Sequence, residues 1–159
     1  MKKIDILKSA MNICDIHSER INKALRHIHH IIPIKADILG ELQDEEISFL
    51  DQITYCFAAL QDTVGNKIFP LILELLEEDV THASFIDKLN KLERIGAISS
   101  TEYWKEIRNI RNEITHEYPD QEEYGGKALT KCIDSAKTLT EYWHFLKKFI
   151  DERIIKEYK

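Results

Sequence analysis

Apolar residues recur at every third or fourth position along most of the chain, which is the spacing of one face of an α-helix. The first stripe predicts a helix from about residue 5 to residue 31, ended by Pro33. A second stripe predicts a helix over about 44–76, which Gly65 and Pro70 should kink or split. No segment alternates at period two over a useful length, so no strand is expected.

Capping residues mark two further helices, and an apolar stripe marks a last one. Ser84, with an acid three residues on, opens a short helix that Gly96 closes. Ser99 begins a fourth helix over 100–117 by the same arrangement, and a fifth is predicted over about 120–158. The sequence therefore predicts an all-α, up-and-down bundle of four to five helices with a kinked second helix.

The chain has 159 residues, 43% of them hydrophobic, which suits one domain over residues 1–159 with its own core. Its net charge is -6, so a surface that binds nucleic acid throughout is not expected. Residues 1–30 carry six Lys or Arg against three acids, whereas residues 41–79 carry ten acids against Lys67 alone. This polarity indicates either one face that meets a charged partner or ordinary solvated helix faces.

Three widely spaced cysteines, Cys14, Cys56 and Cys132, lie in apolar helical stretches. They are expected to be buried thiols in a reducing compartment. No signal peptide is recognisable, and the most apolar run, residues 68–76, is too short to cross a bilayer. The sequence thus favours a soluble, cytoplasmic protein that does not enter a membrane.

Residues 111–118 read R-N-E-I-T-H-E-Y and concentrate most of the chemistry of the chain. Asn112 and His116 are four residues apart, so they share a helix face and Asn112 is expected to orient His116. Arg111 is long enough to reach the same helix end, and Tyr118 lies just beyond the last regular turn. A permanently charged guanidinium beside a proton-exchanging imidazole predicts a phosphate site.

RNA cleavage without metal fits these groups. The ribose 2′-hydroxyl is the nucleophile, His116 transfers the proton and Arg111 stabilises charge on the phosphoryl oxygens. One histidine does not easily serve as both acid and base, so a symmetric dimer would supply the second. The alternative is an exposed polar helix end without catalysis.

The string from Arg111 through His116 to Tyr118 resembles the R-x4-H-x-Y signature of HEPN-domain proteins, most closely the HepT-type toxins. Asn112 matches the polar residue that usually follows the arginine. The resemblance implies a dimeric helical bundle and a metal-independent endoribonuclease toxin. It also implies an MNT-type nucleotidyltransferase antitoxin that silences the toxin by adding AMP to Tyr118. An acidic residue on the second helix, here Asp62, would orient Arg111 or His116.

Two other functional classes stay open. The chain would serve as a non-catalytic helical nucleotide- or RNA-binding subunit of a nucleotidyltransferase complex if Arg111 and His116 only grip phosphate. It would be a purely structural bundle if Arg111 and His116 neither cleave RNA nor bind phosphate. His27 and His30 are close enough on a helix to suggest a metal, but no other ligand lies near them in sequence, so no metal or other cofactor is expected.

Overall fold

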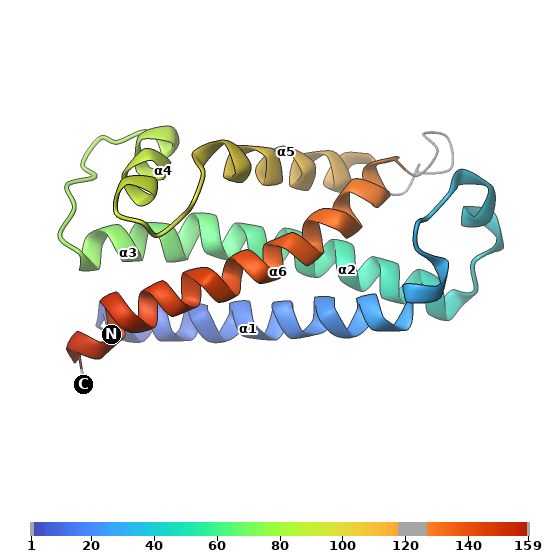
Figure 1. Ribbon diagram of the computed structural model, residues 1–159, viewed down its shortest axis with the longest axis horizontal. Coiled ribbons are helices and arrows are strands. Elements are labelled where there is room, and N and C mark those ends of the chain that lie inside the picture. Colours follow the sequence, from blue (N-terminus) through green and yellow to red (C-terminus); the bar gives the residue numbers. More distant parts are fainter. Residues whose placement is uncertain (1, 118–126, 159) are drawn as a thin grey trace.

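The computed structural model describes residues 2–117 and 127–158 (Figure 1). These two stretches are helical apart from turns and connecting segments, and they contain no strand, which confirms the all-α prediction. None of their helices is both long enough and apolar enough to cross a membrane.

Helix α1 (Lys3–His27) forms one long side of the bundle and ends in a short 3₁₀ turn, η1 (His29–Ile31). Its buried face includes Leu7, Cys14 and Ile21, which are fully inaccessible. Residues seven apart lie about two helical turns from one another on the same face. The predicted stripe is therefore the face that packs on α2 and α6.

The second helical segment runs without a break through α2 (Asp44–Thr63), a π-turn (Val64–Ile68) and α3 (Phe69–Leu75). The predicted irregularity at Gly65 and Pro70 is thus a π-turn and not a division into two separate helices. The wider turn lies directly before Pro70, whose ring clashes with the carbonyl four residues back in a regular α-helix.

Helices α4 (Phe85–Arg94) and α5 (Thr101–Glu117) follow as predicted. The Ser84 hydroxyl accepts from the Asp87 N–H at 3.1 Å, and Gly96 has a φ of +85°, which closes α4. The cap of α5 lies one residue later than predicted, because it is Ser100 Oγ that accepts from the Tyr103 N–H, at 3.1 Å.

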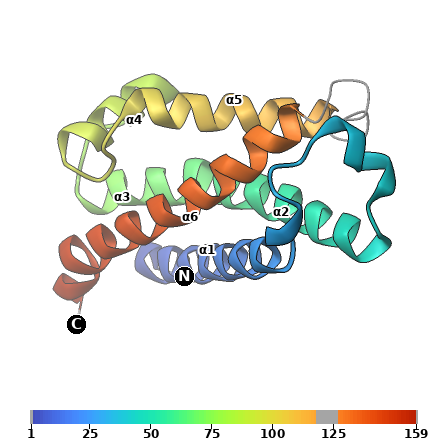
Figure 2. The ribbon, with the colours of Figure 1, turned by 45° about the vertical axis from the view of Figure 1, so that its right-hand side comes forward.

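Helix α6 (Lys127–Arg153) runs diagonally across the bundle, from the end of α5 towards the start of α1 (Figures 1 and 2). Asp15 of α1 fixes this crossing, since it accepts from Trp143 Nε1 at 2.8 Å and from Lys147 Nζ at 2.7 Å. A last 3₁₀ turn covers Ile155–Tyr158. The predicted beginning of this helix, residues 120–126, lies outside the described residues.

All three cysteines are free and buried. Burial raises the pKa of Cys14 and of Cys132 to about 12, and Asp15 adds to the effect at Cys14. Burial also raises the pKa of Cys56. The interior thus disfavours the thiolate, which is the reactive form of cysteine.

We expect the native protein to resist a thiol reagent such as DTNB at pH 8. A thiol with a pKa of about 12 is ionised in only about one molecule in 10⁴ at that pH, and its sulfur is also out of contact with the reagent. All three thiols should react within minutes in denaturant. Stoichiometric labelling of the native protein on that timescale would contradict the buried core.

Candidate functional site

The predicted motif lies in the second half of α5, beside α2. Ile110 and Ile114 are 8% and 3% exposed and point into the core, which fixes the rotation of this part of α5. Arg111 then lies at the edge of the buried face, with its side chain 26% exposed. The isoleucine spacing thus places the guanidinium at the boundary between core and solvent.

Arg111 forms a two-point ion pair with Asp62 of α2. Its Nε donates to Oδ1 at 3.0 Å, and its Nη2 donates to Oδ2 at 2.7 Å. The third nitrogen, Nη1, donates to Thr115 Oγ1 at 3.1 Å, and that hydroxyl donates to the Arg111 carbonyl at 2.9 Å. Every guanidinium nitrogen is therefore held in place.

Three of the five guanidinium N–H donors are used in this arrangement, and the other two have no partner among the described residues. Asp62 is 41% exposed, so the pair is partly solvated. Partly solvated ion pairs contribute only about 0–1 kcal/mol to stability. The geometry consequently matters more for orienting Arg111 than for holding the bundle together.

The predicted site residues do not all meet at one point. Asp62 does reach Arg111, although 49 positions separate them. Asn112 is exposed on a different side of α5, because consecutive residues are about 100° apart around a helix. His116 occupies the next position of the helical row that contains Asn112, but its side chain lies outside the described residues, as does all of Tyr118.

A shallow groove of about 300 Å³ runs between α4 and α5 along the row of Asn112. Lys105, Arg108, Asn109 and Asn112 line it from α5, and Phe85 and Ile86 line it from α4. The Arg108 guanidinium lies over the Phe85 ring, 4.4 Å from its centre. The groove thus presents two cations and two amides on the helix that carries the motif.

Sequence reasoning missed two parts of this region. Thr115 is not among the predicted site residues, although its position four residues after Arg111 places it within reach. For Phe85 and Ile86, the sequence pattern predicts only that they belong to a short helix. Their position beside Arg108 and Asn112 depends on how α4 packs against α5. Helical periodicity carries no information about this packing.

The histidines near the end of α1 have other partners. The His27 ring stacks on Phe49 with 4.4 Å between ring centres and 4° between planes. His30 Nε2 lies 2.9 Å from Glu46 Oε2. The Gln43 N–H and, to a lesser extent, His30 lower the pKa of Glu46. No group of three potential metal ligands occurs within the described part of the chain.

Comparison of the chain with models of protein families, with curated proteins and with solved structures found no match. The arrangement that bears most directly on function is the Arg111 guanidinium, which Asp62 and Thr115 hold in place five residues before His116.

Proposed function

We propose that the chain is a metal-independent endoribonuclease that acts as the toxin of a toxin–antitoxin pair. The observation that carries this proposal is the oriented Arg111, which keeps two N–H donors without a described partner. It lies within a motif that resembles the HEPN signature. A fixed, permanently charged donor suits a phosphodiester that gains charge during cleavage, and His116 follows Arg111 by five positions in the sequence.

In the proposed reaction, the ribose 2′-oxygen attacks the adjacent phosphorus and the bond to the 5′-oxygen of the next nucleotide breaks. A base removes the 2′-hydroxyl proton, and an acid protonates the leaving 5′-oxygen, which yields a 2′,3′-cyclic phosphate and a 5′-hydroxyl end. Arg111 donates to the non-bridging oxygens. His116 performs one proton transfer, and His116 of a second copy performs the other.

The groove between α4 and α5 supports RNA as the substrate. Lys105 and Arg108 supply positive charge there, although the chain as a whole carries -6. Asn109 and Asn112 add amide donors and acceptors along the helix row that reaches position 116. Phosphates would bind the cations, and the salt dependence of binding would be modest because few cations take part.

Exposed apolar side chains support a homodimer. Ile6, Ile13 and Ile16 of α1 are 38–39% exposed, and Tyr55 of α2 is 68% exposed. The Tyr55 ring meets the His17 ring edge-on at 6.2 Å, which joins the two helices into one surface. Tyr55 and Asp62 are seven residues apart and share one side of α2. A second copy that covers this surface would bring two Arg111 side chains close together.

The proposed regulation concerns Tyr118, two residues beyond His116. Addition of AMP by a partner nucleotidyltransferase antitoxin would place a charged, bulky phosphodiester next to Arg111. That group would occupy the donors which RNA requires and would repel the RNA backbone. This part of the proposal rests on the resemblance, because Tyr118 lies outside the described residues.

We expect His116→Ala and Arg111→Ala each to slow RNA cleavage in EDTA by at least about 100-fold. General acid–base catalysis contributes about 10²–10⁴-fold, and one donor to a developing negative charge contributes about 10²–10³-fold. Circular dichroism should show unchanged helix content. His144→Ala, at an exposed position of α6, is the matched control and should cleave normally. Cleavage at the wild-type rate by His116→Ala would refute the proposal. RNA binding without products in the wild type would favour a non-catalytic nucleotide- or RNA-binding subunit.

Asp62 is expected to act through Arg111. Asp62→Asn removes the charge but keeps the shape, so cleavage should fall about tenfold or more while the free energy of unfolding changes by less than about 1 kcal/mol. Asp62→Glu should restore part of the activity, because a carboxylate can still accept from the guanidinium. Equal activity of both variants and the wild type would show that Arg111 does not need this partner.

The dimer is tested by placing a charge on the exposed apolar surface. Tyr55→Glu and Ile13→Glu should shift sedimentation towards the monomer and reduce cleavage in parallel, because an unpaired buried carboxylate disfavours association. Phe145→Glu alters an apolar side chain of α6 that is 53% exposed, and it should leave both properties unchanged. A monomeric variant with full activity would rule out a shared catalytic cleft.

A further inference from the structure

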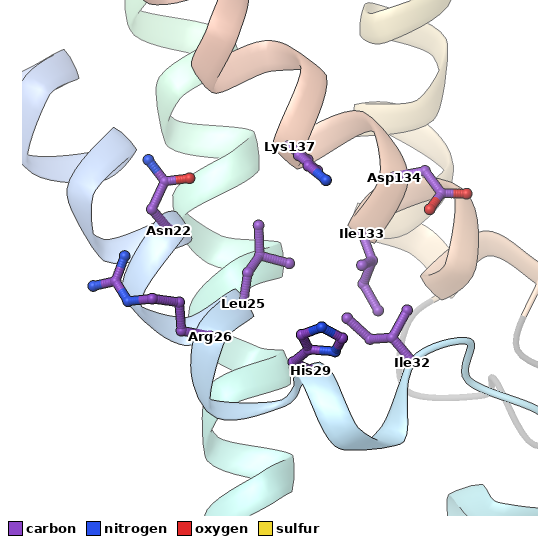
Figure 3. A pocket seen from close by; sticks show the side chains of 8 residues that line it. All are labelled: Asn22, Leu25, Arg26, His29, Ile32, Ile133, Asp134 and Lys137. Carbon is purple, nitrogen blue, oxygen red and sulfur yellow. The ribbon is translucent and has the colours of Figure 1, made fainter.

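A cavity of about 470 Å³ opens between the last turns of α1, the η1 turn and α6 (Figure 3). It shares no lining residue with the Arg111–Asp62 pair or with the groove along α5. Its size falls within the range of about 300–1,000 Å³ typical of small-molecule sites. The cavity is therefore a candidate binding site separate from the one on α5.

The inner surface of the cavity is aliphatic. Leu25 from α1, Ile32 from the segment after η1 and Ile133 from α6 converge on the same space (Figure 3). Ile133 is 4% exposed and belongs to the core, whereas Leu25 and Ile32 are half-buried. Three branched side chains from three elements form an apolar floor, on which a flat or aliphatic group loses contact with water.

The rim of the cavity is cationic. The cations Arg26 and Lys137 line it together with the His29 ring, and none of the three forms an ion pair or side-chain hydrogen bond with another residue that the structure describes. Lys147, farther along α6, is by contrast neutralised by Asp15 at 2.7 Å. Asp134 adds a single carboxylate to the lining. The rim thus carries positive charges that form no ion pair with another described residue.

We infer that this cavity binds a small phosphate monoester that carries a flat aromatic ring, of which a nucleoside monophosphate is the representative class. The phosphate, which carries nearly two negative charges, would bind Arg26 and Lys137. The base would lie on the aliphatic floor. Asn22, also in the lining, both donates and accepts, as recognition of a base edge requires. This site does not depend on the proposed nuclease function.

Isothermal titration calorimetry of the full chain with AMP tests this site. Arg26→Ala and Lys137→Ala should each weaken binding at least tenfold. Lys148→Ala makes the same charge change at an exposed position of α6 outside the cavity, and it should bind as the wild type does. Adenosine and inorganic phosphate should each bind at least tenfold more weakly than AMP. Adenosine lacks the phosphate that binds the cations, and inorganic phosphate lacks the base that packs on the aliphatic floor.

Several outcomes would overturn the inference. One is no heat of binding with AMP, and another is equal binding by Lys137→Ala and Lys148→Ala. Inorganic phosphate that binds as tightly as AMP would show that the aliphatic floor takes no part. Loss of binding in Arg111→Ala would place the nucleotide at the α5 motif instead. A chain that fails to cleave RNA but binds AMP through Lys137 would refute the nuclease and retain this site.

Discussion

The contact between Arg111 and Asp62 links the two helices that carry the candidate chemistry, and the functional interpretation depends on it. Two hydrogen bonds, at 3.0 and 2.7 Å, fix the plane of the guanidinium against α2. The contact exists because α5 is held in one rotation. Trp104, fully buried, packs edge-on against Phe69 with 4.7 Å between ring centres. A Cβ added at Gly65 would make an ordinary contact, 3.6 Å from the same indole, which shows that α5 packs directly against the π-turn.

The sequence predicted most of the helices because their signals are local. The stripe through Leu7, Cys14 and Ile21 and the cap at Ser84 depend on neighbours within a few residues. The start of α5 was misplaced by one residue for a tertiary reason. The Ser99 N–H donates to the Tyr142 hydroxyl at 2.9 Å, and this contact spans 43 positions. Capping patterns contain no information about a partner so far along the chain.

The candidate site was only partly predictable for the same reason. Arg111 and His116 stood out as a motif, and Asp62 came from the resemblance alone, since helical periodicity cannot pair residues 49 positions apart. Two described members of the expected cluster lie on different sides of α5. Arg111 faces α2, and Asn112 faces the groove beside α4. Adjacent residues on a helix cannot point the same way, so this division follows from the spacing itself.

The measurement that tests the central claim most directly is the chemistry of the RNA ends formed by the purified wild-type chain in EDTA. The account predicts 2′,3′-cyclic phosphate and 5′-hydroxyl ends. It also predicts no cleavage of an otherwise identical oligonucleotide whose 2′-hydroxyls are replaced by hydrogen, because the nucleophile would be missing. Products with 5′-phosphate ends, or cleavage of the 2′-deoxy strand, would contradict attack by the 2′-hydroxyl at a phosphate held by Arg111.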